Sequence, residues 1–242
     1  MNLPPDPAYV PYKGIRKMIG SRMHESVASQ AQLTLNTSAD ASGLLAARKL
    51  AKDGATARGL PSITINDLIC WTVARTLPRF PDVNAVFDAE GQRIAQHSRV
   101  NLGVAVDTPR GLVVPNVADA QDMALPDLSR TLARHVDECR KGTIDMDLLT
   151  GGTFTVTNLG SLGIETFTPI VNIPQAAILG VCAIRDAAAL DAKGDVTVRP
   201  RIGLSLTIDH RVVDGAPGSR FLQELVKGLE TVLESVRPLF AV

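Results

Sequence analysis

Few cysteines, no net charge and no long apolar run are the first features of this 242-residue sequence. The three cysteines, Cys70, Cys139 and Cys182, lie far apart and form no Cys-x-x-Cys pair. This usage favours buried thiols in a reducing compartment over a disulfide or a nucleophile. Lys plus Arg and Asp plus Glu balance at 25 each, so we expect neither nucleic acid nor an anionic membrane as a partner. Local basic pockets for a phosphate-bearing ligand are compatible with this balance.

Signals for membrane insertion, export and several enzyme classes are also missing. No run of about 18 apolar residues predicts a transmembrane helix, and the N-terminus lacks the basic and apolar regions of a signal peptide. We therefore predict a cytoplasmic protein. No His-Glu-x-x-His, Cys-x-x-Cys or carboxylate cluster suggests a metal. Without a Gly-x-Ser-x-Gly elbow, a P-loop or a Gly-x-Gly-x-x-Gly after a strand, hydrolase, NTPase and dinucleotide-binding functions lack support.

What is present is an irregular interleaving of helix and strand patterns. Apolar spacing predicts helices over 14–26, 42–54, 66–77, 124–142 and 218–236. Alternation predicts strands over 32–41, 175–184 and 201–211 and within 151–163, and a hairpin over 99–117. The second helix should stop at Gly54, and the third should have Asn66 or Asp67 as its cap and end before Pro78. Lacking strict βαβ alternation, the pattern predicts one α/β or α+β domain with a mixed sheet over 13–242, after a proline-rich linker remnant over 1–12.

The stretch “SLTIDHRVVDGAPGSRF” raises the question of chemistry. Alternation puts His210 at the end of an apolar row formed by Ile202, Leu204, Leu206 and Ile208. A partly buried imidazole at a strand end can act as a base. The competing interpretation is a core or edge histidine, with Asp214 as the cap of a helix that carries Pro217 in its first turn. Nothing distinguishes the other three histidines, His24, His97 and His135.

The combination of four blocks decides between these interpretations. “DHRVVDG” resembles the C-terminal active-site signature of the dihydrolipoamide acyltransferases, the E2 cores of 2-oxoacid dehydrogenase complexes, and chloramphenicol acetyltransferases share its general His-x-x-x-Asp-Gly pattern. Three more blocks are similar to the family in the same order: “GIRKMIGSRMHES”, “NLGVAVDTPRGLVVP” and “GGTFTVTNLGSLGIETFTPIVNIPQAAILGV”. The resemblance spans roughly residues 11 to 240. It implies a two-layer fold like that of chloramphenicol acetyltransferase, with a mixed sheet flanked by helices.

The resemblance implies direct acyl transfer between a dihydrolipoyl group and coenzyme A. His210 would take the proton of the coenzyme A thiol, because the thiol itself is a poor nucleophile. Thr157 would donate a hydrogen bond to the tetrahedral oxyanion; the commoner family pattern has serine here, and the extra methyl of threonine restricts its χ1. Without the resemblance, Thr157 is simply a good β-former.

Further residues take supporting roles by resemblance. Asp214 would support the geometry of the site, paired with an arginine near the N-terminus for which Arg16 and Arg22 are both candidates. Residues of the turn after the Thr-rich strand would approach coenzyme A: Asn158, Gly160, Ser161 and Gly163. The two glycines of this turn are equally explained by backbone conformation.

Assembly follows from the same resemblance. Family members form homotrimers with the histidine and the hydroxyl supplied by different chains, and trimers join into cubic or dodecahedral cores through an apolar C-terminal tail. The ending “RPLFAV” suits such a tail, with a proline that stops the helix before it; a tail folded onto its own domain is the alternative. No lipoyl-lysine hairpin is present in the sequence, so we expect a core fragment, or a short form served by a lipoyl domain on another protein. The E1 and E3 components would bind through domains absent from the sequence.

Two alternatives stay open. An acetyltransferase of the same fold could act on a small-molecule acceptor, although residues 14–20 and 108–115 argue against it. A non-catalytic structural core subunit would tend to lose the histidine, which is present as His210. The acyl group carried is not predictable from the sequence, and the compartment would be the mitochondrial matrix in a eukaryote.

Overall fold

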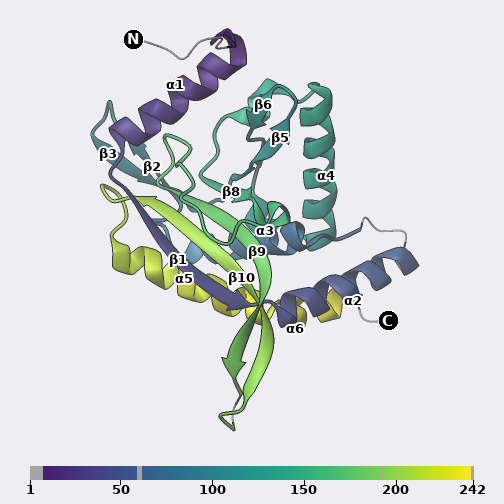
Figure 1. Ribbon diagram of the computed structural model, residues 1–242. Helices are drawn as coiled ribbons and strands as arrows, with labels where there is room; N and C mark the ends of the chain where they lie inside the picture. The colour runs from purple at the N-terminus through teal and green to yellow at the C-terminus, as the bar shows by residue number, and fades with distance from the viewer. Residues whose placement is uncertain (1–7, 59–61, 192, 241–242) are drawn as a thin grey trace.

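A six-stranded mixed sheet organises the chain, of which the computed structural model describes residues 8–58, 62–191 and 193–240 (Figure 1). Its strands, in spatial order, are β1 (Gln32–Asp40), β10 (Val196–Asp209), β9 (Ala177–Leu190), β8 (Phe154–Asn158), β4 (Leu102–Val104) and β7 (Asn116–Val117). β8 runs parallel to both of its neighbours, and the other pairings are antiparallel. The predicted mixed sheet is therefore confirmed.

Helices pack against one face of this sheet: α5 (Gly215–Glu230), α3 (Ile65–Thr76) and α2 (Ser42–Arg58). Phe154 of β8 lies against Phe221 of α5, with ring centroids 5.8 Å apart. Both rings are buried, and aromatic burial of this kind contributes strongly to a core. On β10 the predicted apolar row is buried as far as Ile208, but Ser205, Thr207 and Asp209 on the other face are buried as well, so both faces of this strand are covered. These contacts hold the strands that carry the candidate site residues against a solid core.

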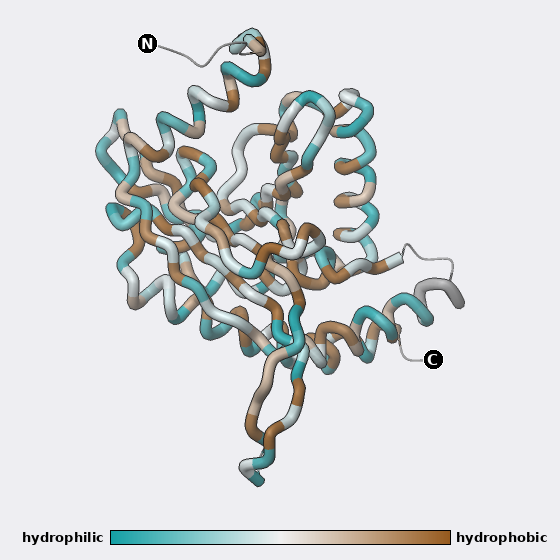
Figure 2. Tube along the Cα trace, in the orientation of Figure 1, coloured by the Kyte–Doolittle hydropathy of each residue, from teal (hydrophilic) through white to brown (hydrophobic). Residues whose placement is uncertain are grey.

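Two further helices lie at the periphery, α1 (Gly14–Ser29) and α4 (Leu125–Lys141). α4 directs its apolar residues toward the body and its polar ones outward (Figure 2), as its sequence predicts. Gly142 ends it in the left-handed conformation, with φ of 74°. Short 3-10 turns lie between the longer elements: η1 (Leu77–Arg79), η2 (Ala120–Asp122), η3 (Met146–Leu149) and η4 (Gly160–Leu162).

Two small hairpins and a long ribbon stand beside the main sheet. The predicted hairpin is β5 (Val106–Thr108) with β6 (Gly111–Val113). A second hairpin, β2 (Ala85–Asp88) with β3 (Arg93–Gln96), has no counterpart among the predicted elements. β9 and β10 also continue past their neighbours as a projecting two-stranded ribbon (Figure 1), so both are longer than predicted.

Two predicted helix boundaries are wrong, one because of a contact distant in sequence and one because of a local cap. α2 does not stop at Gly54, because this glycine lets Phe240 pack closely: a Cβ there would lie 2.9 Å from the Cβ of Phe240. The cap of α3 is Thr64, whose hydroxyl accepts from the amide of Asp67 while that carboxylate accepts from the amide of Thr64. This is a reciprocal capping box. Burial raises the pKa of the Asp67 carboxyl despite these hydrogen bonds.

The C-terminal helix also differs from its prediction. It is interrupted at Thr231, and α6 (Val232–Phe240) follows with Pro238 inside it, so this proline does not stop the helix. Phe240 is only 1% exposed and packs on α2 of its own chain. This part of the tail is therefore folded onto its own domain, while Val242 lies outside the described residues. None of the described helices is long and apolar enough to cross a membrane.

Candidate active site

Thr157 occupies a sheltered position near the end of β8, in the interior of the sheet. Its strand neighbours Phe154 and Val156 are buried toward the helices, so Thr157 and Thr155 lie on the opposite face. Thr155 donates a hydrogen bond to the side chain of Gln175, 2.7 Å away. Within the described part of the chain, the Thr157 hydroxyl makes no hydrogen bond, and the residue is only partly buried. It is therefore free to donate to a ligand.

The turn after Thr157 holds the four residues predicted to approach coenzyme A. Asn158 donates to Asn66 at 3.0 Å and accepts from the amide of Gly160 at 2.8 Å. Gly160 is required by packing, because a Cβ there would lie 2.4 Å from the carbonyl oxygen of Cys182. Gly163 has φ of +80°, and Ser161 is exposed. Backbone conformation and packing thus explain both glycines, and their contact with coenzyme A stays a prediction.

His210 lies just beyond β10, at the other end of the sheet's central strands. Its backbone amide donates to the carbonyl of Ala31 at 2.8 Å, while its side chain is 45% exposed. The apolar row is fully buried up to Ile208, and burial decreases at His210, so the imidazole is the partly exposed end of that row, as predicted. Nδ1 of His210 lies 3.4 Å from Oδ1 of Asp214. An exposed imidazole beside a carboxylate is accessible to a substrate proton.

Asp214 does take the N-cap position of α5, as predicted, but its side chain makes no cap hydrogen bond. Its carboxylate, 79% exposed, is directed toward His210 instead. Neither candidate arginine pairs with it in the described chain: Arg22 donates to the carbonyl of Ile173 at 3.1 Å, and Arg16 is exposed on α1. The structure thus brings together His210 and Asp214 and leaves both arginines apart from them.

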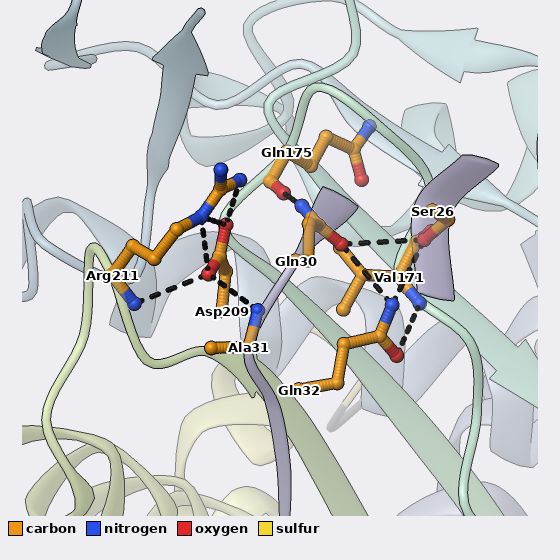
Figure 3. A network of polar contacts seen from close by, with 8 residues as sticks. All are labelled: Ser26, Gln30, Ala31, Gln32, Val171, Gln175, Asp209 and Arg211. Carbon is orange, nitrogen blue, oxygen red and sulfur yellow. Dashed lines mark hydrogen bonds and ion pairs between the residues drawn. The ribbon is translucent and has the colours of Figure 1, made fainter. Parts of the chain in front are cut away.

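The residues flanking His210 form a polar network that the sequence interpretation overlooked (Figure 3). The carboxylate of Asp209 is fully buried and binds the guanidinium of Arg211, with its shortest contact at 2.6 Å. It also accepts from the backbone amide of Ala31 at 3.3 Å. The adjacent Gln30 donates to the carbonyl of Gln175, and Gln32 accepts from the amide of Val171. The network therefore extends to the segment between η4 and β9. The sequence does carry a signal for this network, because an aspartate and an arginine directly flank the histidine.

Strand register separates the two candidate catalytic groups within one chain. Thr157 pairs with Gly180, which pairs with Ser205, five positions before His210. At about 3.3 Å per residue and about 4.8 Å per strand, the two residues are about 17 Å apart along the sheet and about 10 Å across it. A base and an oxyanion donor must both lie about 3 Å from the reacting atoms. One chain alone therefore does not bring them to the same substrate.

Two adjoining cavities lie elsewhere, between α1 and the β5–β6 hairpin and beneath the segment around Ile173. Their volumes are about 320 Å³ and about 350 Å³, and they share Arg22, Leu149 and Asn172 in their walls. The first is lined mainly by apolar side chains of α1 and the hairpin. Neither His210 nor Thr157 borders them, so they are separate from the two catalytic candidates.

The three cysteines are free and buried, as predicted. Burial raises the pKa of Cys70, Cys139 and Cys182 above the ordinary thiol value. A raised pKa lowers the thiolate fraction at neutral pH, which argues against a cysteine nucleophile. In the residues that the structure describes, no group of three or more His, Cys, Asp or Glu side chains is placed to hold a metal ion.

Comparison with known proteins identifies the family of the chain. Residues 4–236 match the model for the catalytic domain of the 2-oxoacid dehydrogenase acyltransferases. The chain belongs to this family. It is 38% identical over 93% of its length to the dihydrolipoyllysine-residue acetyltransferase component of the acetoin cleaving system of Bacillus subtilis, and covers 55% of that protein. It is 34% identical to the succinyltransferase component of the 2-oxoglutarate dehydrogenase complex of Haemophilus influenzae, with 91% of this chain and 53% of that protein covered. The chain thus spans about half the length of these acyltransferase components.

Solved structures of the same acyltransferase family agree closely. The dihydrolipoamide acetyltransferase of Azotobacter vinelandii is 30% identical, with a TM-score of 0.89 over 98% of this chain and 99% of that one. A cubic core of the pyruvate dehydrogenase multienzyme complex has the same TM-score at 31% identity and the same coverage. A chloramphenicol acetyltransferase matches at a TM-score of 0.52 and 13% identity, covering 90% of this chain and 92% of that one, and shares the fold alone. The predicted fold class is confirmed.

Proposed function

We propose that the chain transfers an acyl group between a dihydrolipoyl group and coenzyme A, as the catalytic core of a 2-oxoacid dehydrogenase complex. Membership of the acyltransferase family supports the reaction class. The observation that carries the site assignment is the exposed imidazole of His210 beside Asp214. In the Azotobacter relative, a serine, a histidine and an asparagine were studied for their role in the catalytic mechanism, and the last two are four positions apart, as are His210 and Asp214.

The chemistry follows from the available groups. His210 takes the proton of the coenzyme A thiol, and the thiolate attacks the carbonyl carbon of the acyl-dihydrolipoyl thioester. The carbon–sulfur bond that forms makes a tetrahedral oxyanion, to which the hydroxyl of Thr157 donates a hydrogen bond. Collapse of this intermediate breaks the bond to the lipoyl sulfur, which takes the proton back from His210. The same groups serve the reverse direction.

The separation of Thr157 and His210 supports a site shared between subunits. Because the two groups of one chain are about 20 Å apart by strand register, Thr157 would act with the His210 of a neighbouring copy. A cyclic homotrimer supplies three such sites by repeating one interface. This arrangement predicts a particle three times the 25.7 kDa mass of the chain.

Larger assembly and further partners are also part of the proposal. A cubic core is described for one structural relative, whereas Phe240 here is buried on its own domain. We therefore propose the trimer as the basic unit, and mass measurement distinguishes it from a cubic or dodecahedral core. The lipoyl group would be presented by a lipoyl domain, and the E1 and E3 components would associate through parts of the protein outside this core. The compartment we propose is the cytoplasm.

Turnover with free dihydrolipoamide tests the reaction. A panel of acetyl-, propionyl-, isobutyryl- and succinyl-coenzyme A should give acyl-dihydrolipoamide with at least one member, since the curated relatives include both acetyl- and succinyltransferases. The acyl preference across the panel names the substrate, because one methylene in an apolar pocket is worth about 1–3 kcal/mol. Transfer only to a hydroxyl acceptor such as chloramphenicol, or to no acceptor, would reject the proposal.

A further inference from the structure

The turn that carries His210 is held by its two flanking side chains. The Asp209 carboxylate accepts hydrogen bonds from the amide of Arg211 at 3.1 Å and from Nε at 3.0 Å on each oxygen, besides the contact with Nη2. Charge-assisted, forked contacts of this kind are both strong and geometrically specific. Asp209 is fully buried, whereas His210 between the two partners is exposed.

The backbone of the same turn is tied on both sides. The carbonyl of Asp209 accepts from the amides of Val212 and Val213, each at 2.9 Å. The amide of His210 donates to the carbonyl of Ala31, whose own amide donates to the Asp209 carboxylate. Asp209 thus joins the end of β10, the start of the next turn and the segment between α1 and β1 (Figure 3).

The imidazole itself has little other support. In the described chain, its polar contact is with the exposed carboxylate of Asp214 at 3.4 Å. The guanidinium of Arg211, in contrast, also lies over the ring of Phe87, with 4.1 Å from Cζ to the ring centroid. The backbone of the turn therefore fixes the point from which the His210 side chain extends, and the Asp209–Arg211 pair helps to hold that backbone.

We propose that Asp209 and Arg211 are positioning residues for His210: their buried ion pair fixes the turn so that the imidazole meets the coenzyme A thiol. This inference rests on the proposed role of His210. No contact with the reacting atoms is proposed for either partner, because Asp209 is fully buried and the Arg211 guanidinium is held between Asp209 and the ring of Phe87. A displacement of about 1 Å in a reacting group can cost about 100-fold in rate, so a small relaxation of this turn is enough to slow the reaction.

Asp209→Asn is the most direct variant, because it preserves the shape of the side chain and removes the negative charge that binds the Arg211 guanidinium. We expect kcat to fall by about 10- to 100-fold, with KM for coenzyme A and dihydrolipoamide within about two-fold and the trimer mass unchanged. Arg211→Lys keeps the positive charge but loses the planar fork, and should give a smaller fall in kcat. If Asp209→Asn does not fold, Arg211→Lys alone carries the test.

A second readout does not depend on activity. Amide hydrogen exchange of the peptide containing His210, Val212 and Val213 should accelerate in Asp209→Asn, because these amides close the turn. Leu229→Ala is the matched control: it opens a cavity at the opposite end of α5, where Leu229 is fully buried. This control should lower the melting temperature while leaving kcat and the local exchange of the turn unchanged.

The outcomes separate the two proposals. Wild-type kcat in Asp209→Asn, together with an inactive His210→Ala, overturns the positioning role and leaves the proposed function intact. Wild-type activity in His210→Ala overturns the proposed mechanism itself. If amide hydrogen exchange in the turn is unchanged in Asp209→Asn, the Asp209–Arg211 pair does not hold the turn, whatever the kinetics are. A fall in kcat that Leu229→Ala reproduces at equal loss of melting temperature would assign Asp209 to general stability.

Discussion

Thr157 and His210 are held in place by different means. Thr157 belongs to an interior strand that pairs with β4 on one side and β9 on the other, so the register of the sheet determines where its backbone lies and which face its side chain takes. His210 lies beyond the last residue of β10, where strand register no longer applies, and the ion pair between its neighbours Asp209 and Arg211 holds the turn instead. A hydroxyl can thus be positioned by the fold alone, whereas the base needs dedicated neighbours. The two regions should respond differently to substitution.

Removal of the base should have the largest effect. His210→Ala is expected to lower kcat/KM by about 10²–10⁴-fold, the usual contribution of a general base, without changing the mass of the oligomer. Steady-state kinetics with acyl-coenzyme A and dihydrolipoamide give the value. His24→Ala, which removes an exposed histidine from α1, is the control and should retain activity. Equal activity in both variants would contradict the assignment of the base.

Removal of the oxyanion donor should come next. Thr157→Val keeps the shape of the side chain and deletes the hydroxyl, and we expect kcat to fall by about 10²–10³-fold. Thr157→Ser keeps the hydroxyl on the same Cβ position and should stay close to the parent, with a small loss because serine is less restricted at χ1. A rise in KM with unchanged kcat in Thr157→Val would instead indicate a role in ground-state binding.

Asp214 should matter less than either residue. Its carboxylate is 79% exposed at 3.4 Å from Nδ1 of His210, and exposed pairs contribute about 0.2–1 kcal/mol. Asp214→Asn should therefore lower kcat/KM by less than about five-fold. Its helix-capping position should not make the variant unstable, because the side chain makes no cap hydrogen bond. A loss as large as that of His210→Ala would show that Asp214 does more than orient the imidazole.

The cysteines should have the smallest effect. Because burial raises the pKa of all three thiols, the folded protein should react slowly with a thiol reagent at neutral pH, and quickly once unfolded. Labelling of the unfolded protein should give three reacted thiols per chain, which is the reference value. Rapid loss of activity on stoichiometric labelling of the folded protein would show that one thiol is reactive after all.

The sequence predicted the parts of the fold in which local pattern and tertiary packing agree. The alternation of Phe154 and Val156 against two threonines identified the face of β8 that carries the Thr157 hydroxyl, and the apolar stripe of α4 with Gly142 beyond it defined that helix. The capping box of α3 has the ordinary sequence pattern, Thr64 with Asp67 three positions later, and this pattern favours Thr64 over Asn66 or Asp67 as the cap.

The remainder depends on contacts that are distant in sequence. Gly54 resembles a helix stop until Phe240 is seen packed against it. The apolar row of β10 predicts a strand that continues through His210, yet the strand ends one residue earlier. The separation of His210 from Thr157 follows only from the pairing of three strands, which no local pattern specifies.

Mixed oligomers test the central claim, that Thr157 and His210 act together across a subunit interface. His210→Ala and Thr157→Val, each nearly inactive alone, are coexpressed with different tags, and mixed trimers are isolated through both tags. With random assortment of a cyclic trimer, about a quarter of all sites combine an intact histidine with an intact threonine. The account predicts turnover near that fraction of the parent rate, enriched further in doubly tagged trimers. Doubly tagged trimers no more active than either variant alone would contradict it.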